Sequence, residues 1–187
     1  MPITTLDPTT ALIVIDLQAG VVTLPVEPSP ASVIARTVEL LESFRRHGLP
    51  VVLVNVDAGA PGRTEAGGIG ALARPAGWTE LVPELDARPS DQLVTKKTWG
   101  AFQGTGLAEL LRDNGVTQVV ITGIATSAGV ESTARQAYEH GFNVTLATDA
   151  MGDRNPEMHT NSIRNIFPRL GETGTTAEIL SVLEANR

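Results

Sequence analysis

The sequence predicts a three-layer, Rossmann-like α/β fold, with one mostly parallel sheet of about six strands and helices on both faces. Short apolar runs alternate with amphipathic stretches along the chain, which is the pattern of a parallel sheet covered by helices. Three of the apolar runs are continuous, as expected of strands that are buried on both faces. The length of 187 residues suits one domain of ordinary size. We therefore expect residues 1–187 to form a single domain.

Five of the strands can be placed from runs that are rich in Val, Ile, Leu and Thr. Strands and helices alternate throughout, which predicts a doubly wound sheet whose functional crevice lies beyond the C-terminal ends of the strands. The predicted strands are residues 10–16, 51–56, 92–96, 117–122 and 143–148.

The first long helix is predicted from Pro30 to about His47. Ser29 is a suitable N-cap, Pro30 takes the first helical position, and Gly48 ends the helix. The helical periodicity predicts a core face made of Ile34, Val38, Leu41 and Arg45, with Phe44 beside them. Further helices are predicted over residues 104–113, 127–140 and 155–167, and from the capping-box pattern of residues 175–178.

The bulk composition argues against several classes of function. A net charge of −7 argues against binding to nucleic acids or to anionic membrane surfaces. The chain contains no cysteine, which excludes disulfides, thiolate metal sites and thiol catalysis. The N-terminus does not read as a signal peptide, and the longest apolar run, residues 11–15, is too short to cross a bilayer. We expect a cytoplasmic protein that acts on a small molecule without a cofactor.

Three polar features fall at the C-terminal ends of predicted strands, which share one edge of a parallel sheet. Asp16 closes the first strand, Lys96 closes the third, and the turn of residues 123–129 follows the fourth. Burial should raise the pKa of Asp16, and a hydrogen bond to Lys96 should lower it. A group that shuttles protons needs its pKa set by two such opposing effects. Strand alternation then directs Lys97 away from the crevice. In the competing interpretation Asp16 caps a loop and Lys96 is a solvated surface charge.

The segment Val119–Ala134 reads as a buried strand that turns sharply into a helix. Its turn contains small residues, so a ligand can approach the backbone closely. The first N–H groups of a helix lack intrahelical partners and carry partial positive charge, which favours an anion or a developing oxyanion. Glycine stands at position 129, where a nucleophile would be expected at such a turn. Residues 57–75, rich in Gly, Ala and Pro, are predicted to form a lid or specificity loop at the same edge.

Three segments in this order, Leu12–Gln18, Thr95–Phe102 and Gly123–Ala134, together resemble the isochorismatase-like hydrolase family. Two later segments, Asp149–Met151 and Gly171–Thr176, are similar to that family's later landmarks. The resemblance therefore spans nearly the whole chain.

The resemblance implies a site in which most members use an Asp–Lys–Cys triad on amides and related C–N bonds. Asp16 matches the acid/base residue and Lys96 matches the lysine, whereas Gly129 stands at the position of the cysteine. The family's vinyl-ether hydrolases are similar in carrying glycine there. The resemblance also implies a non-proline cis peptide at Ile124–Ala125 and a homo-oligomer, either a dimer or a tetramer.

Two departures from the family's pattern bear on the ligand. Relatives that hold a metal carry an Asp-x-His pattern after the second strand, where this chain has no histidine in residues 57–61. The vinyl-ether hydrolases carry a glutamine near the end of that strand, where this chain has Asn55-Val-Asp57. We therefore expect no metal, and a substrate other than isochorismate itself.

The predicted function is hydrolysis of a small molecule by acid–base catalysis at Asp16 and Lys96, with direct attack by water and no covalent thiol intermediate. One alternative is a serine hydrolase, because Ser127, Asp149 and His159 follow the α/β-hydrolase order. Another is a protein that has kept the pocket for binding or scaffolding. Trp99 and Phe102 are expected either in the core or as walls of an apolar pocket. The predicted catalytic positions are Asp16, Lys96 and Gly129, and the predicted substrate-binding residues are Gln18, Trp99, Phe102, Ile124, Ala125, Ser127 and Ala128.

Overall fold

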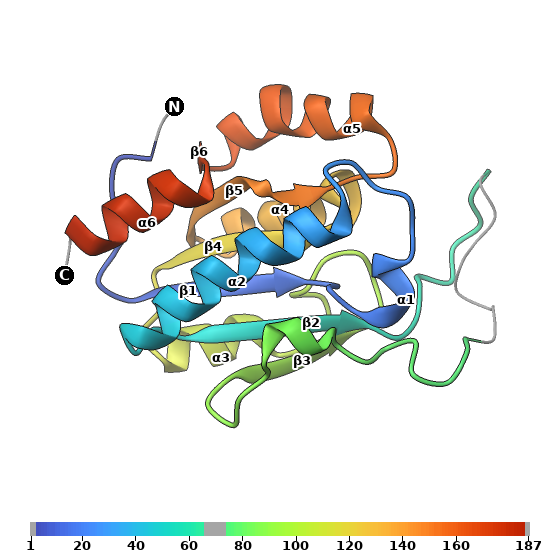
Figure 1. Ribbon diagram of the computed structural model, residues 1–187, viewed down its shortest axis with the longest axis horizontal. Helices are drawn as coiled ribbons and strands as arrows, with labels where there is room; N and C mark the ends of the chain where they lie inside the picture. Colours follow the sequence, from blue (N-terminus) through green and yellow to red (C-terminus); the bar gives the residue numbers. More distant parts are fainter. Residues whose placement is uncertain (1–2, 66–73, 186–187) are drawn as a thin grey trace.

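The computed structural model describes residues 3–65 and 74–185. These residues form a six-stranded sheet in the order β3-β2-β1-β4-β5-β6, and all neighbouring strands are parallel (Figure 1). The predicted fold class is confirmed. The strands are β1 (Thr10–Ile15), β2 (Val51–Val56), β3 (Gln92–Lys96), β4 (Gln118–Ile124), β5 (Asn143–Gly152) and β6 (Glu172–Gly174).

Helices cover both faces of this sheet. Among the described residues, no helix is long and apolar enough to span a membrane. Short 3-10 turns occur at Pro83–Leu85 and Phe167–Arg169, and π-helical turns at Thr126–Val130 and Ser162–Ile166. The α-helices are α1 (Ala19–Val22), α2 (Pro30–Arg46), α3 (Leu107–Asp113), α4 (Glu131–Glu139), α5 (Pro156–Asn161) and α6 (Thr176–Ala185).

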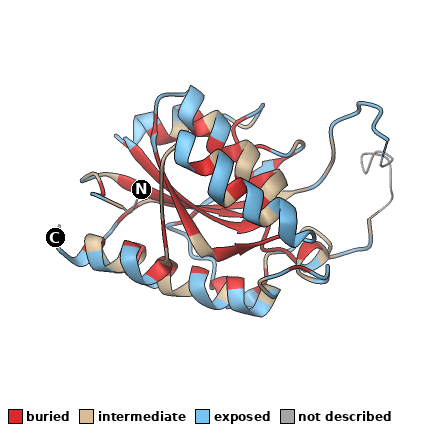
Figure 2. Ribbon diagram, turned by 90° about the horizontal axis from the view of Figure 1, so that it is seen from above, coloured by how far each residue is buried: buried red, intermediate tan, exposed pale blue. Residues whose placement is uncertain are grey.

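Two apolar clusters fill the spaces between the sheet and its helices. One cluster contains side chains of α2 and α6, and the other contains side chains of α3 and α4. Strand β1 contributes to both, because Leu12 and Val14 belong to the first cluster and Ile13 and Ile15 to the second. Figure 2 shows the buried strands between the two helical layers. The molecule therefore has the three layers that the sequence predicts.

Strand β5 is longer than the sequence predicts. It runs to Gly152 rather than ending at residue 148. Its register with β4 shifts, so that Ile121 pairs with Leu146 whereas Gly123 pairs with Met151. The sequence conceals this extension because Asp149 interrupts the apolar run. The four other predicted strands agree with the structure to within two residues.

Helix α2 has the predicted caps, but its buried face agrees with the predicted one only at Leu41 and Phe44. The Ser29 side chain accepts a hydrogen bond from the backbone N–H of Ser32, and Pro30 occupies the first turn. The predicted core residues Ile34 and Val38 are only half-buried. The buried row lies about one residue, or 100°, around the helix, and its residues are Val33, Thr37, Leu40, Leu41, Ser43 and Phe44.

The later helices are less regular than predicted. Helix α3 begins at Leu107, because Gly104 and Gly106 adopt positive φ angles of 69° and 73°. The segment predicted as one helix over residues 155–167 is divided into α5, a π-helical turn and a 3-10 turn. The capping box at the start of α6 is confirmed, since Glu178 accepts hydrogen bonds from the N–H and the hydroxyl of Thr175.

Candidate active site

The order of the strands locates the crevice of this fold. Successive strands are added outward in one direction through β1, β2 and β3, and in the other through β4, β5 and β6. Ligands of doubly wound folds bind at the reversal point, beyond the C-terminal ends of the strands. Here that point lies between β1 and β4. Asp16 follows the first of these strands, and the Gly123–Gly129 turn begins in the last two residues of the second.

Asp16 leaves the sheet in an uncommon backbone conformation. Its φ angle is +54°, in the left-handed region that non-glycine residues seldom adopt and that Asp tolerates better than most. Its N–H still donates to the carbonyl of Val54, 2.9 Å away, so the turn begins at the last rung of the β1–β2 ladder. The side chain is buried, with the residue 5% exposed. Strained backbone of this kind costs about 1–3 kcal/mol and occurs preferentially at functional sites.

Lys96 reaches Asp16 from two strands away. Its Nζ lies 2.7 Å from Asp16 Oδ2, and both side chains are buried. Strand β2 separates β3 from β1, so the two strands are about 10 Å apart, a span that the side chains of Lys96 and Asp16 bridge together. Lys97 is exposed, as strand alternation predicts. In the structure, therefore, Lys96 is not a solvated surface charge.

The ammonium of Lys96 has a protein partner for each of its three protons. Besides Asp16 it donates to the carbonyl oxygens of Trp99, at 2.7 Å, and Thr98, at 3.3 Å. Lys96 therefore has no remaining donor for a ligand in this conformation. Its contribution to the site is its positive charge and its hold on one carboxylate oxygen.

Two opposing effects set the pKa of the Asp16 carboxyl group. Burial raises its pKa to about 6, and the neighbouring Lys96 ammonium opposes that rise by its charge and its hydrogen bond. Oδ1 is buried and has no hydrogen-bond partner among the described residues. A carboxylate oxygen without a partner has its lone pairs available to accept a proton, and it can donate one once it is protonated.

The turn after β4 brings a third component against this ion pair. Gly123 has a φ angle of +119°, and a Cβ atom there would lie 2.0 Å from the carbonyl oxygen of Ile15. The peptide bond between Ile124 and Ala125 is cis. A Cβ atom at Gly129 would lie 3.2 Å from Asp16 Oδ2 and 3.4 Å from Lys96 Nζ. The backbone of residue 129 thus lies directly beside the two charged groups.

The first N–H groups of the turn are partly engaged within the protein. Both the N–H and the hydroxyl of Ser127 donate to Asp153 Oδ2, each at 2.7 Å. Asp153 also accepts from the N–H of Asn155, and its backbone pairs with that of Glu27. Asp153 therefore accepts the hydrogen bond of the Ser127 N–H, which the sequence analysis predicts to bind an anionic ligand.

The residues of the proposed serine triad are not assembled. Ser127 contacts Asp153 instead of a histidine. His159 lies 2.8 Å from the hydroxyl of Thr126 through Nδ1, and Asp149 accepts from the N–H and hydroxyl of Thr176. Burial lowers the pKa of His159, while the charges of Asp153 and Glu27 oppose that shift. This arrangement does not support the serine-hydrolase interpretation.

Several predicted substrate-binding side chains lie elsewhere. Phe102 packs in the core with Phe142, at a ring separation of 5.9 Å, so its assignment to the pocket wall is wrong. Ile124 is buried in the core cluster beneath α2, so only its backbone belongs to the turn. The ring of Trp99 is largely exposed, while its carbonyl holds Lys96. Ala125 and Ala128 are half-buried in the turn beside Gly129, where the sequence predicts them.

Gln18 is wholly buried and bonded to backbone rather than presented to a crevice. Its side-chain amide donates to the carbonyl oxygens of Val56 and Trp78 and accepts from the N–H of Val56. Sequence reasoning misplaced Gln18 and missed Asp153. The same rule that selected Asp16, a polar residue after a parallel strand, would have selected Asp153 had the length of β5 been recognised.

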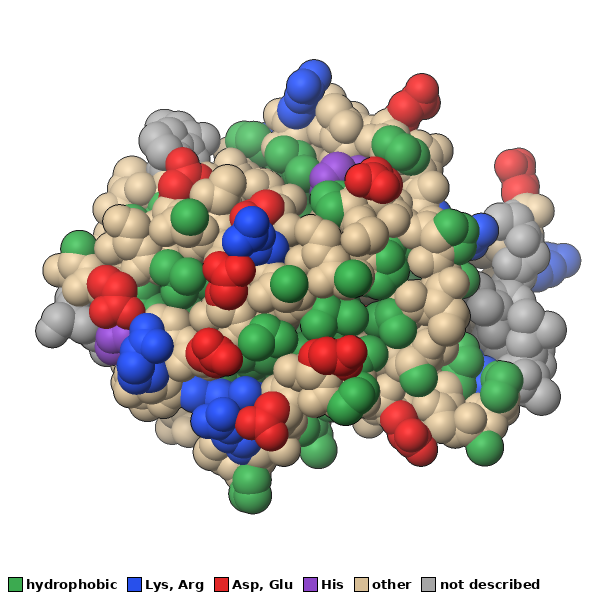
Figure 3. Space-filling view, in the orientation of Figure 1, with side chains coloured by type: hydrophobic (Ala, Val, Ile, Leu, Met, Phe, Trp, Pro, Cys, Tyr) green, Lys and Arg blue, Asp and Glu red, His purple; other side chains and the backbone are tan. Residues whose placement is uncertain are grey.

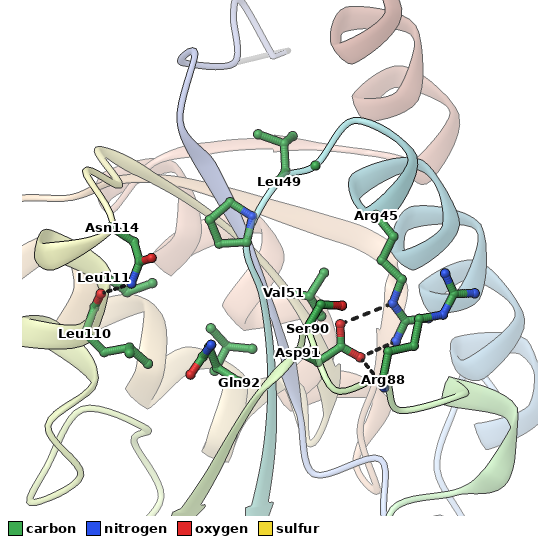
Figure 4. Close-up of a pocket in the computed structure, with 13 residues that line it drawn as sticks. Arg45, Leu49, Val51, Arg88, Ser90, Asp91, Gln92, Leu110, Leu111 and Asn114 are labelled. Atoms are coloured by element: carbon green, nitrogen blue, oxygen red, sulfur yellow. Dashed lines mark hydrogen bonds and ion pairs between the residues drawn. The ribbon is translucent and has the colours of Figure 1, made fainter.

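A separate cavity lies at the opposite edge of the sheet, where β2 and β3 begin (Figure 4). Its volume is about 330 Å³, and it is bordered by the ion pair of Arg45 with Asp91. It is remote from Asp16, which follows the other end of β1, so it is not part of the candidate site. Within residues 3–65 and 74–185, no group of three or more His, Asp or Glu side chains is placed to hold a metal ion.

Comparisons with known proteins agree with this architecture. Residues 10–178 match the family model of the isochorismatase domain. The isochorismatase family protein YwoC of Bacillus subtilis, described as uncharacterized, is 42% identical over 177 residues, which cover 91% of this chain and 92% of that protein. The ureidoacrylate amidohydrolase RutB of Methylobacterium radiotolerans is 30% identical over 173 residues, which cover 81% of this chain and 67% of that protein. The structure of an isochorismatase family protein from Burkholderia thailandensis matches with a TM-score of 0.92 at 42% identity, covering 96% of this chain and 98% of that one.

Proposed function

The chain belongs to the isochorismatase family of hydrolases, and we propose that it hydrolyses a small molecule by acid–base catalysis at Asp16, with direct attack by water. One observation carries the proposal. A buried carboxylate is held by a buried ammonium through one oxygen, while its other oxygen has no partner among the described residues. With no cysteine in the chain and Gly129 beside the pair, a thiol cannot serve as nucleophile.

Asp16 acts as the proton carrier in this proposal. Its Oδ1 accepts a proton from water while the water oxygen forms a bond to the electrophilic carbon of the substrate. When the bond to the leaving group breaks, the same proton passes to that group and Asp16 returns to its ionised form. A pKa of about 6 suits both steps near neutral pH.

Lys96 and the turn supply electrostatic stabilisation. The Lys96 ammonium keeps Asp16 oriented and keeps its ionised form accessible despite burial. In this proposal the backbone N–H groups at Ala125 and Gly129 stabilise the developing negative charge. Those of Ser127 and Ala128 are already engaged, with Asp153 and with the carbonyl of Ala125. Relatedness to an amidohydrolase favours an amide-type C–N bond as the reacting group.

The proposal is tested with a panel of small amides, ureido acids and enol ethers. Asp16→Asn should lower turnover by at least about 100-fold while calorimetric binding of the substrate is retained. Lys97→Met, which removes the exposed neighbour of Lys96, is the matched control and should leave turnover unchanged. Retained turnover in Asp16→Asn overturns the proposed mechanism.

Direct attack by water also predicts the mass of the enzyme during turnover. Rapid acid quenching with saturating substrate should yield protein of unmodified mass at every time point. A transient adduct on the protein would instead establish a covalent intermediate. Binding by the wild-type protein without turnover across the panel would favour the alternative of a small-molecule-binding protein.

We also propose that the chain forms a homo-oligomer, a dimer or a tetramer. Half-buried Ile34 and Val38 on α2 line a groove of about 700 Å³ together with Val22 and Ala35. Figure 3 shows apolar side chains interspersed with acidic ones on this face. Sedimentation velocity tests the proposal, and a monomer at micromolar concentration would contradict it.

A further inference from the structure

Strand β1 departs from its neighbour before β2 has ended. The last backbone bond between them runs from the N–H of Asp16 to the carbonyl of Val54. The chain then turns aside at Asp16, with its φ of +54°, whereas β2 continues to Val56. The N–H and C=O of Val56 therefore face the side of the sheet from which β1 has withdrawn.

The side chain of Gln18 fills this position in the ladder. Its Oε1 accepts from the N–H of Val56 at 2.7 Å, and its Nε2 donates to the carbonyl of Val56 at 3.0 Å. These are the two bonds that the backbone of β1, had the strand continued, would have made with the same residue. The second proton of Nε2 is donated to the carbonyl of Trp78 at 3.1 Å. The amide is wholly buried, so these bonds are made out of water.

The end of β2 is in turn the support for Lys96. Val56 pairs with Lys96 in the β2–β3 register, and the N–H of Asp57 donates to the carbonyl of Lys96 at 3.1 Å. Gln18 is thus joined to both members of the ion pair. It lies two residues after Asp16 along the chain, and it reaches Lys96 through Val56.

Gln18 also holds the segment around Trp78 against the chain that follows β1. The carbonyl of Trp78 accepts from the N–H of Gly20 as well as from Gln18. A Cβ atom at Gly20 would lie within 2.2 Å of three atoms of the Trp78 ring, so the ring packs directly on this glycine. The position of residue 78 against the segment that follows Asp16 therefore depends on the same amide.

We propose that Gln18 is a positioning residue, whose side-chain amide replaces the missing backbone of β1 and so sets the distance between Asp16 and Lys96. The proposal rests on the proposed role of that pair in catalysis. It gives Gln18 no contact with substrate, because both of its donors and its acceptor oxygen are engaged with backbone groups.

Gln18→Met tests the proposal, because methionine keeps the length of the side chain and removes all three hydrogen bonds. Gln118→Met is the matched control. Gln118 is also a buried amide bonded to backbone, through the N–H of Asp7 and the carbonyl of Thr5, but it lies at the start of β4, at the opposite edge of the sheet. Both variants should unfold at lower urea concentration than the wild type, since each leaves buried polar groups without partners.

Only Gln18→Met should alter the Asp16 carboxyl titration, followed by ¹³C NMR. Its pKa should rise by roughly one unit, because Lys96 is held less firmly against it. An unchanged titration in folded Gln18→Met overturns the proposal, as does an equal shift in Gln118→Met.

Gln18→Asn provides a second variant if Gln18→Met does not fold. It keeps the amide on a shorter side chain and should produce a smaller shift in the same direction, so no shift in folded Gln18→Asn would also overturn the proposal. The titration needs no turnover. An inactive wild-type protein would therefore refute the proposed function without affecting this result.

Discussion

The two oxygens of Asp16 have different surroundings, and this asymmetry defines the chemistry available at the site. Oδ2 is held by Lys96, whose three protons are all committed, whereas Oδ1 is buried without a partner among the described residues. The sequence assigns both residues to one crevice but cannot assign roles to individual atoms. In the proposed mechanism, proton transfer therefore belongs to Oδ1 and Lys96 acts by its charge.

The raised pKa of Asp16 predicts an unusual dependence of stability on pH. The folded protein binds this proton up to about pH 6, whereas an unfolded chain releases it near 3.8. The contribution of Asp16 to stability is therefore fully present below 3.8 and is lost as the pH rises through 6. The loss should amount to about 3 kcal/mol, from the difference between the two pKa values.

Urea denaturation between about pH 4 and pH 7 measures this effect. The free energy of unfolding of the wild type, minus that of the double variant Asp16→Asn/Lys96→Met, should fall as the pH rises, because other carboxylates cancel in the difference. A difference that is flat or that increases with pH would contradict the assignment.

At the scale of elements, the turn after β4 depends on two glycines for different reasons. Gly123 is required by its φ of +119° and by the carbonyl of Ile15, which a Cβ atom would strike. Gly129 lies in the π-helical turn without a positive φ, but a Cβ atom there would border the ion pair and would approach Ile15 Cγ2 to 2.9 Å. The first glycine shapes the turn, and the second leaves the space beside the ion pair without a side chain.

Gly123→Ala should therefore destabilise the protein strongly, by about 3 kcal/mol or more, because the added methyl group meets rigid backbone. Gly141→Ala is the control, since Gly141 also has a positive φ, 85°, but a Cβ atom there meets nothing within 4 Å. It should cost only about 1 kcal/mol. Equal losses in urea denaturation would show that the close approach of β1 and β4 does not constrain the turn.

The sequence predicts best the strands that are covered by helices on both faces. Continuous apolar runs identify the buried strands, because both faces of the sheet are covered. The core face of α2 is predicted correctly at Leu41 and Phe44 but one residue out of phase in its first half, since the helix carries apolar residues such as Ile34 outside its buried row. The turn at Asp16 and the extension of β5 depend on tertiary contacts that no local pattern records.

At the scale of the whole molecule, the C-terminal and N-terminal ends of the strands have different roles. The C-terminal edge holds the strained turn and the ion pair of the candidate site. The opposite edge holds a second buried ion pair, Arg45 with Asp91, at 2.6 Å. Asp91 also accepts from the N–H of Arg88, so this pair fastens the chain that leads into β3 to the end of α2.

Asp91→Ala should reduce the free energy of unfolding by about 3–5 kcal/mol, because it leaves the buried guanidinium of Arg45 without a negatively charged partner. Glu184→Ala, which breaks the exposed pair of Glu184 with Arg46, should have a much smaller effect. The folded fraction of both variants should keep its turnover, since neither residue lies at the candidate site. Loss of turnover in folded Asp91→Ala would show that the two edges are coupled.

Topology explains how far the candidate site could be predicted from the sequence. The rule that parallel strands end at one edge brought Asp16, Lys96 and the turn at Gly129 together, and the structure places them in contact. The rule concerns strand ends only, so it could not show that Phe102 turns into the core or that Gln18 serves the backbone. Such assignments require the positions of side chains relative to other elements.

Titration of the Asp16 carboxyl by ¹³C NMR, in the wild type and in Lys96→Met, tests the central claim most directly. The account predicts a pKa of about 6 in the wild type and a higher value in Lys96→Met, because the ammonium that opposes the effect of burial has been removed. Lys97→Met should leave the titration unchanged. A wild-type pKa near the ordinary value of 3.8, or a titration that does not respond to Lys96→Met, would contradict the account.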